Sequence, residues 1–327
     1  MKRRFKTGIS RNSGLSLNIL TDDECHEIHL ATLELLKDTG VYCESEEALS
    51  YFDGGGCTID LAKKVVKFPN WVIEDAIRVS PGSITCSGRS VEDDVILEDN
   101  RVTFTNFGEA IRFVDPYTGE HRDSTKADLI NTTRVIDYLD HIDTCERAML
   151  SGDKPPEVQA LHNGEAMLNN TTKHLFLAPV NRYQARKVIE MCGTVVGGKE
   201  KLKERSLVTF GTCPISPLKL PEDHTDVIIE AAKNGIALFS VGMALSGGSS
   251  PIHLAGTLVV QNVEMLSSLV LSQLVEKGAK FIYGSSTCPI DMRTANATVG
   301  SPETGVISAA VARLARYYSL PCFVAGG

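Results

Sequence analysis

Three cysteines and two histidines lie at or near the ends of short apolar segments or on the loops that follow them. Cys213, Cys288 and Cys322 fall at or near the ends of such segments, and His224 and His253 lie on the nearby loops. Thiolates and imidazoles are preferred ligands of zinc, which activates substrate heteroatoms. No pair of these residues has the short fixed spacing of a zinc motif, and each cysteine also suits a small buried apolar position. We therefore expect no bound metal and keep zinc chemistry as an alternative.

Two carboxylates flank one long polar loop, residues 284–303. Asp291 and Glu303 are the candidate catalytic residues of this loop, because a carboxylate binds a cationic substrate or transfers a proton. Glu303 follows a Ser-Pro pair at the start of an expected helix, where a carboxylate also simply complements the helix dipole. His253 follows a Gly/Ser-rich loop and is a candidate substrate contact, although a lone histidine is more often only hydrogen-bonded.

Aromatic side chains occur on successive apolar segments of the chain. A methylated ammonium ion is attracted to aromatic faces, although aromatic residues of strands mostly fill the core. Tyr283 is the favoured contact because it adjoins the long loop and carries a polar hydroxyl group. The candidate substrate-binding residues are Tyr283, Phe210, Ser285, Ser286, His253, Gly326 and Gly327.

The elements that must position these residues recur from about residue 143 onward. A short apolar strand, a Gly/Ser/Pro/Thr-rich loop and an amphipathic helix repeat at the size of a βα unit. This alternation predicts an α/β fold, a (β/α)8 TIM-type barrel that is incomplete in this chain and has its active site on the loops after the strands. No GxGxxG or P-loop motif follows a strand, which argues against a nucleotide-binding open sheet. The predicted strands are 143–150, 174–180, 206–212, 236–242, 280–286 and 320–327, with "RVTFTN" (101–106) as a possible first strand.

The first hundred residues show a different pattern. Thr21 and Glu24 form a capping box that predicts a helix, and "GGGCTIDLAKKVVKFP" reads as a short hairpin. A second hairpin is expected to turn at 115–119. We predict an N-terminal region of helices and short strands over residues 1–100, followed by six or seven βα units over residues 101–327.

Composition excludes several classes of protein. The net charge of −8 leaves no clustered Lys/Arg surface for nucleic acid, and "MKRRFK" at the start reads as a solvated arm. No unbroken apolar stretch reaches the roughly 18 residues of a membrane span. The nine cysteines contain no CxxC pair, which indicates reduced thiols. We expect a soluble cytoplasmic protein that binds neither nucleic acid nor membrane.

Three segments together carry a resemblance to a known family. They are "FVDPYTGEHRDSTKADL" (113–129), "GSSTCPIDMRTANATVGSPETG" (284–305) and "ARLARYYSLPCFVAGG" (312–327). With "LTDDECHEIHLATLELLKDTGV" (20–41) at the other end, the whole chain resembles the trimethylamine:corrinoid methyltransferase family, with the closest likeness to its methanogen members.

The resemblance implies a fold and an activity. Members are barrel proteins that pass a methyl group from trimethylamine to the Co(I) of a separate corrinoid protein, releasing dimethylamine, in methylamine-dependent methanogenesis. In the methanogen members pyrrolysine directly follows the "GG" that ends this chain, so the resemblance implies that the residue immediately after Gly327 is the principal catalytic one. It also implies no tightly bound cofactor, a corrinoid protein as partner and a homo-oligomer. The family extends well over a hundred residues beyond this point, so we expect this chain to end short of the whole protein.

The chemistry explains why an unusual residue is wanted. Neutral dimethylamide is a very poor leaving group, so the amine nitrogen must become four-bonded and positive before its methyl group leaves. Our hypothesis is that the amine lone pair adds to the electrophilic imine carbon of pyrrolysine, while protein residues orient the adduct. Three alternatives stay open: a glycine betaine type methyltransferase with an ordinary residue at that position, a zinc-dependent barrel methyltransferase or lyase, and a binding module without activity.

Overall fold

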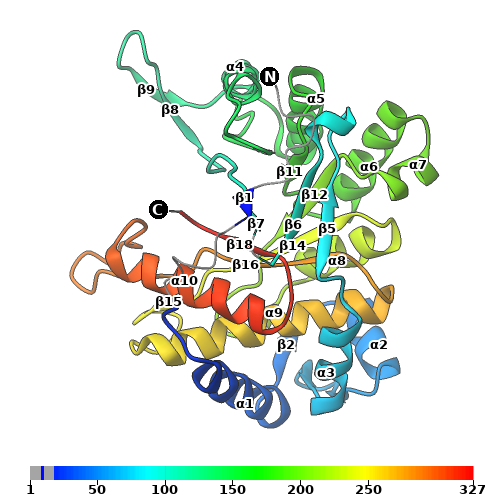
Figure 1. Ribbon diagram of the computed structural model, residues 1–327, viewed down its shortest axis with the longest axis vertical. Helices are drawn as coiled ribbons and strands as arrows, with labels where there is room; N and C mark the ends of the chain where they lie inside the picture. Colours follow the sequence, from blue (N-terminus) through cyan, green and yellow to red (C-terminus); the bar gives the residue numbers. More distant parts are fainter. Residues whose placement is uncertain (1–8, 11–17, 100, 327) are drawn as a thin grey trace. The chain divides into compact units, whose positions relative to one another are not determined.

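The computed structural model describes residues 9–10, 18–99 and 101–326 (Figure 1). The expected basic arm at residues 1–6 and Gly327 lie outside the described residues. The chain forms two compact units. Unit 1 comprises Met1–Arg11, Ile84–Gly211 and Asn234–Ala237, and unit 2 comprises Asn12–Ser83, Thr212–Lys233 and Leu238–Gly327. The boundary that we predicted at residue 100 stays a prediction.

Six short strands form one sheet in the order β10-β11-β12-β14-β16-β18, and each register described within it is parallel. At least one helix separates each strand from the next along the chain, which confirms the predicted α/β alternation. The strands are β10 (Cys145–Glu146), β11 (Leu175–Leu177), β12 (Val208–Thr212), β14 (Ala237–Gly242), β16 (Phe281–Ser285) and β18 (Cys322–Val324). The helices are α5 (Pro156–Asn170), α6 (Arg182–Val196), α7 (Lys199–Glu204), α8 (Glu222–Lys233), α9 (Leu254–Val275) and α10 (Pro302–Tyr317).

The possible seventh parallel strand was a wrong prediction. Its first two residues form β7 (Arg101–Val102), which pairs antiparallel with β1 (Ile9–Ser10) in a separate two-stranded sheet. The segment that follows, residues 103–109, has no regular secondary structure. A short apolar alternation does not specify the strand that pairs with it. The sequence alone therefore did not distinguish a parallel strand of the large sheet from an antiparallel partner of β1.

Unit 1 also carries small antiparallel elements and one further helix. The predicted hairpin is confirmed: β8 (Arg112–Val114) pairs with β9 (His121–Asp123), and the Asp115 amide donates to the Glu120 carbonyl at 2.9 Å. The next helix begins with a capping box between Thr125 and Asp128. The remaining elements are β5 (Ser83–Cys86), η1 (Val91–Asp93), β6 (Val95–Glu98) and α4 (Lys126–Tyr138).

Unit 2 confirms the predicted N-terminal elements within its own range. The Thr21–Glu24 capping box begins helix α1, and β3 and β4 form the predicted hairpin with Ile59 opposite Val66. The remaining elements are α1 (Asp22–Asp38), β2 (Val41–Cys43), α2 (Glu46–Gly54), β3 (Thr58–Asp60), β4 (Val65–Lys67), α3 (Asn70–Val79), β13 (Lys219–Leu220), β15 (Leu245–Ser246) and β17 (Cys288–Pro289).

Helix α9 is the central helix of unit 2. It contacts α1, α3, α8, α10 and β16. By length and composition it could cross a membrane, but 78% of its most apolar 18-residue window is buried in the protein, as in the core helix of a soluble protein. Three polar side chains on it, Gln261, Asn262 and Glu264, are completely buried. Buried polar groups are costly unless hydrogen-bonded, so their partners matter below.

Candidate active site at the carboxyl ends of the strands

The last residue of β10 in unit 1 is a glutamate. Glu146 lies opposite Phe176, and Phe176 lies opposite Thr209, so these three side chains share one face of the sheet. Leu177 lies on the other face and packs on α5, where a Cβ added at Gly164 would lie 3.7 Å from Leu177 Cδ1. Glu146 is therefore directed away from the helix layer at the carboxyl end of its strand, where α/β barrels place their chemistry.

The environment of Glu146 favours proton transfer near neutral pH. Burial, reinforced by the nearby Glu109 and opposed by Arg147, raises the pKa of Glu146 to about 7. The backbone of Glu146 is fixed, because its N–H donates to Asn106 Oδ1 at 2.9 Å and its carbonyl accepts from Asn106 Nδ2 at 2.9 Å. A carboxyl group with such a pKa, at a strand end, is a candidate general acid or base.

Arg147 and Glu109 complete this cluster. The Arg147 side chain is buried, forms an ion pair with the partly exposed Glu109 and donates from Nη1 to the Ala178 carbonyl at 3.3 Å. Only glycine fits at position 108: a Cβ there would lie 2.7 Å from the Arg147 carbonyl oxygen and 3.0 Å from Glu146 Oε1. The residues from 108 to 109 therefore pack directly over the end of β10.

In unit 2, the sheet face opposite the helices carries two aromatic side chains in contact with each other. Phe239 lies opposite Ile282, and Gly284 lies opposite Phe323, so these side chains share one sheet face. The rings of Phe239 and Phe323 lie 4.9 Å apart, and Gly284 between the two strands has no side chain. Aromatic faces suit a methylated amine, which has an apolar surface and a positive charge. A Cβ at Gly284 would lie 2.3 Å from the Ser240 carbonyl oxygen, so only glycine fits there. The sequence favoured Tyr283 as the aromatic contact instead.

Tyr283 and Phe210 lie on the opposite, helix-facing side of their strands. The buried Tyr283 hydroxyl lies 2.7 Å from Asn262 Oδ1 and 3.0 Å from Gln261 Oε1, both on α9. Burial raises the pKa of Tyr283 well above its ordinary value. Phe210 lies opposite Leu177 and is fully buried. These positions favour packing roles, and substrate contact by either residue stays a prediction.

The two carboxylates of the long loop have local structural partners. Asp291 Oδ1 accepts from the amides of Arg293 at 2.7 Å and Thr294 at 3.3 Å, and so closes a turn. Glu303 lies in the first turn of α10, whose N-cap is Ser301. These local contacts give each carboxylate a structural role that needs no catalysis. A catalytic role for either carboxylate stays a prediction.

The other predicted contacts lie in unit 2 around the ends of β14, β16 and β18. Ser285 Oγ accepts from the Thr287 amide at 3.1 Å, and the Ser286 amide donates to the Gly242 carbonyl at 2.8 Å. Gly326 directly follows Ala325, whose amide donates to the Ser285 carbonyl at 3.2 Å. Ser285, Ser286 and Gly326 are thus close to one strand end. His253 is exposed at the N-cap of α9, and Gly327 and the residue after it lie outside the described residues.

The zinc alternative lacks a ligand cluster in the described part of the chain. No group of three or more His, Cys, Asp or Glu side chains there is placed to hold a metal ion. Burial raises the pKa of the Cys322 thiol to about 12 and lowers the pKa of His224 to about 3. His224 lies between Thr212 Oγ1 at 3.1 Å and Ser268 Oγ at 3.0 Å, so it acts as a neutral core residue.

A completely buried carboxyl group of unit 2 was also missed by the sequence reasoning. Glu264 of α9 accepts from Ser216 Oγ at 2.8 Å and from the Leu218 amide at 3.1 Å, which anchors the loop between β12 and β13. Burial raises its pKa to about 7, against the effect of these hydrogen bonds. The sequence does contain a signal for both residues, because charged side chains are rarely buried. Glu264 lies inside an apolar helix, and Glu146 ends an apolar strand.

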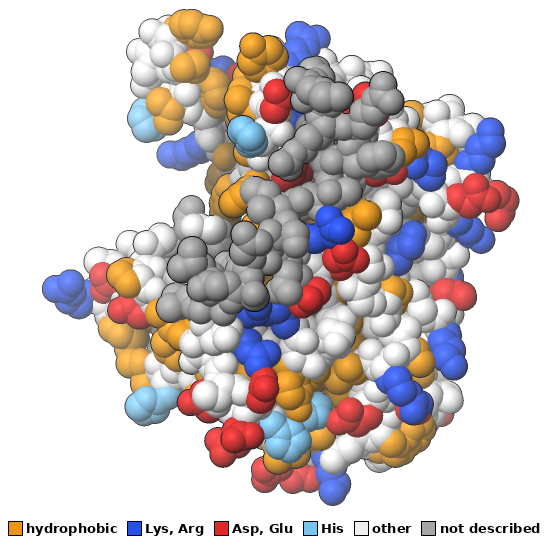
Figure 2. Space-filling model, in the orientation of Figure 1, with side chains coloured by type: hydrophobic (Ala, Val, Ile, Leu, Met, Phe, Trp, Pro, Cys, Tyr) orange, Lys and Arg blue, Asp and Glu red, His pale blue; other side chains and the backbone are white. Residues whose placement is uncertain are grey.

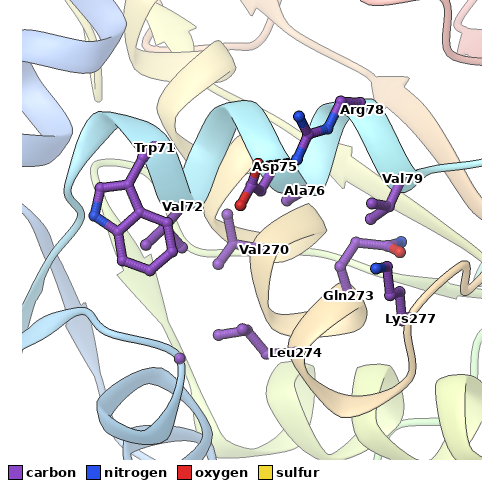
Figure 3. A pocket seen from close by; sticks show the side chains of 11 residues that line it. Trp71, Val72, Asp75, Ala76, Arg78, Val79, Val270, Gln273, Leu274 and Lys277 are labelled. Atoms are coloured by element: carbon purple, nitrogen blue, oxygen red, sulfur yellow. Dashed lines mark hydrogen bonds and ion pairs between the residues drawn. The ribbon is translucent and has the colours of Figure 1, made fainter.

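One open cavity lies elsewhere in unit 2. It has a volume of about 190 Å³ between α3 and the last turns of α9, with Trp71, Asp75, Val270 and Leu274 in its lining (Figure 3). The last turns of α9 precede β16, so this cavity lies toward the amino end of that strand. It therefore lies away from the carboxyl end of β16.

Comparison with known proteins gives a consistent result. The family model described as trimethylamine methyltransferase (MTTB) matches residues 4–327. The trimethylamine methyltransferase MttB of Desulfitobacterium hafniense is 44% identical over 100% of this chain and 66% of its own length. The MttB of Methanosarcina barkeri (strain Fusaro) is 36% identical over 99% of this chain and 67% of its own length. The bacterial relative is thus more similar than this archaeal one, which corrects our reading of a closest likeness to methanogen members.

Two further matches complete the comparison. A glycine betaine methyltransferase of Desulfitobacterium hafniense (strain Y51) is 28% identical over 95% of this chain and 64% of its own length. The solved structure of the Methanosarcina barkeri monomethylamine methyltransferase aligns with 93% of this chain and 67% of that chain, with a TM-score of 0.49 and 14% identity. The chain spans about two thirds of the length of the curated relatives that it matches. Because the family model covers almost every residue, the chain belongs to the trimethylamine methyltransferase (MTTB) family.

Proposed function

We propose that the protein containing this chain transfers a methyl group from trimethylamine to the Co(I) of a cognate corrinoid protein and releases dimethylamine. Family membership and the names of the two most similar relatives described above support this activity. The six parallel strands and their helices are, on this proposal, the first part of a complete (β/α)8 barrel.

The observation that carries the proposal furthest is Glu146 at the end of β10. An alkylamine, like the lysine side chain, is mostly protonated near pH 7 and then has no lone pair to react. A carboxylate with a pKa of about 7 accepts the N–H proton of trimethylammonium and leaves the free amine. The free amine then has the lone pair that our hypothesis requires for addition to an imine carbon.

The remaining parts of the proposal follow the family resemblance. The residue after Gly327 supplies the electrophile. The corrinoid belongs to a partner protein and acts as the methyl acceptor, so no tightly bound cofactor is needed. We further propose a cytoplasmic homo-oligomer that works in methylamine-dependent methanogenesis or in an equivalent bacterial methylamine pathway.

The second candidate is a quaternary-amine methyltransferase, favoured by the similarity to a glycine betaine methyltransferase. A quaternary ammonium ion has no N–H proton and needs no proton acceptor. Glu146 therefore favours the tertiary amine over the quaternary one.

A comparison of two substrates tests this proposal. The protein that contains this chain, purified from its own host, is mixed with its reduced corrinoid partner and given trimethylamine or glycine betaine in separate reactions. We expect one dimethylamine released per trimethylamine consumed, measured by proton NMR, and no dimethylglycine from betaine. Dimethylglycine as the main product would reassign the protein to quaternary amines, and zinc at one equivalent in the active protein would support the zinc alternative.

A further inference from the structure

The segment 106–110 is fastened to the end of β10 at two points. Asn106 hydrogen-bonds both backbone groups of Glu146, at 2.9 Å each. Four residues later, the Ala110 amide donates to the Ala148 carbonyl at 3.0 Å. All of these residues belong to unit 1. The segment therefore has a fixed position relative to the Glu146 backbone within one compact unit.

Glu109 lies between these two points and beside the end of β10. A Cβ added at the preceding residue, Gly108, would lie 3.0 Å from Glu146 Oε1. The Glu109 carboxylate forms an ion pair with Arg147, the residue that follows Glu146. Charged side chains of both signs are interspersed over the visible surface of the molecule (Figure 2), and exposed ion pairs add little to stability. The pair of Glu109 and Arg147 differs from these, because the Arg147 side chain is only 5% exposed.

Two carboxyl groups thus lie near one buried cation. Arg147 binds Glu109 through Nη2 and the Ala178 carbonyl through Nη1 at 3.3 Å, and its buried Nε has no hydrogen-bond partner in the described part of the chain. The neighbouring charges that act on Glu146 are those of Glu109, which raises its pKa, and of Arg147, which lowers it. A guanidinium bound to Glu146 itself would lower the proton affinity of that carboxylate and make it a weak base.

We propose that Glu109 is a positioning residue for Glu146: it holds the Arg147 guanidinium in an ion pair and so leaves Glu146 without a bound cation. This inference rests on the proposed function, in which Glu146 accepts the N–H proton of trimethylammonium. One cation favours the ionised form of the carboxylate that it binds, and the charge of that carboxylate disfavours ionisation of the second. Glu146 is thereby a better proton acceptor than a carboxylate paired with arginine.

Removal of the charge at each end of the ion pair tests the proposal. Glu109→Gln and Arg147→Gln break the same pair, so a purely structural role predicts the same defect in both, whereas control of Glu146 predicts opposite shifts. We expect the midpoint of the kcat/KM profile for trimethylamine to fall from about 7 to about 6 or lower in Glu109→Gln. In Arg147→Gln it should rise to about 8 or higher, because a neighbouring charge changes a carboxyl pKa by roughly 1 to 3. Rates between about pH 5 and about pH 9 cover both midpoints.

Two further variants serve as controls. Glu109→Asp keeps the negative charge, and we expect it to keep the midpoint of the unmodified protein. Glu165→Gln is the matched control, because Glu165 is also a partly exposed carboxylate of unit 1, 48% exposed against 43% for Glu109, and it forms an ion pair with Lys126. Its loss should leave the pH profile unchanged.

Infrared difference spectroscopy follows the protonation of Glu146 without turnover. The carboxyl band that Glu146→Gln removes should titrate at a lower pH in Glu109→Gln and at a higher pH in Arg147→Gln than in the unmodified protein. Arg147 is buried, so if Arg147→Gln does not fold, the titration of Glu109→Gln decides the proposal by itself. An unchanged midpoint in Glu109→Gln, or shifts in the same direction in both variants, would overturn the proposal. Opposite shifts in a protein that never methylates the corrinoid partner from trimethylamine would instead refute the proposed function.

Discussion

Replacement of Glu146 by glutamine is expected to lower kcat for trimethylamine by about 10²- to 10⁴-fold, the usual contribution of a positioned general base. Glutamine keeps the size of the side chain but cannot accept a proton. The free carboxylate is the active form, so kcat/KM of the unmodified protein for trimethylamine should rise with pH through about 7, the raised pKa of Glu146 in the free protein, and level off above it. The Glu146→Gln variant should lose this rise. Steady-state rates between pH 5.5 and 8.5, a range set on either side of that pKa, measure both effects.

Glu157→Gln is the matched control for this experiment. Glu157 is an exposed glutamate in the first turn of α5, in the same unit as Glu146. We expect it to retain the rate and the pH profile of the unmodified protein. If Glu146→Gln also retained both, Glu146 would have no part in proton transfer, and the preference for a tertiary amine would lose its structural support.

Replacement of Glu264 by glutamine is expected to stabilise the protein, and increasingly so as the pH rises. The folded-state pKa of Glu264 is raised to about 7 from an ordinary value of 4.5, so the folded protein holds this proton more tightly than the unfolded chain does. The carboxyl group therefore lowers the free energy of unfolding as the pH rises from 4.5 to 7, by at most about 3 kcal/mol. The amide avoids this loss, since its oxygen accepts from Leu218 N–H and its NH₂ group donates to Ser216 Oγ.

Denaturant unfolding at several pH values measures this effect. The difference between Glu264→Gln and the unmodified protein should be close to zero near pH 4.5 and reach on the order of 2 kcal/mol at pH 8. Glu34→Gln, at an exposed position of α1 in the same unit, should show a small difference that does not depend on pH. A Glu264→Gln variant that is less stable at pH 8 would show that the charged carboxylate is the form that holds the loop.

The sequence predicted those parts of the fold that depend on residues close together in the chain. The six apolar segments became the six parallel strands, because strands buried by helices need apolar residues on both faces. The β8–β9 turn and the capping boxes depend on a few adjacent residues, so their signals are also local. The segment at 101–106 was misread because its pairing with β1 depends on residues about ninety positions earlier in the chain, which no local pattern reveals.

The residues of the site were less predictable. Which side chains come together depends on the sheet face that each strand residue occupies and on neighbours that are distant in the sequence. Tyr283 and Gly284 are adjacent in sequence, yet the first points to α9 and the second lies on the face shared by Phe239 and Phe323. Sequence periodicity does not show which alternate set faces the helices when both are apolar. Glu146 was missed because its raised pKa depends on burial and on Glu109, which is 37 positions away in the chain.

Single-turnover methylation of the corrinoid partner tests the central claim most directly. The protein that contains this chain is mixed with an equimolar amount of Co(I) corrinoid protein, trimethylamine is added, and the visible absorbance of the corrinoid is recorded. The account predicts loss of the Co(I) spectrum and formation of one methyl-Co(III) per corrinoid, with much slower methylation by Glu146→Gln. A Co(I) spectrum that trimethylamine leaves unchanged, in a protein that still binds the corrinoid partner, would contradict the account.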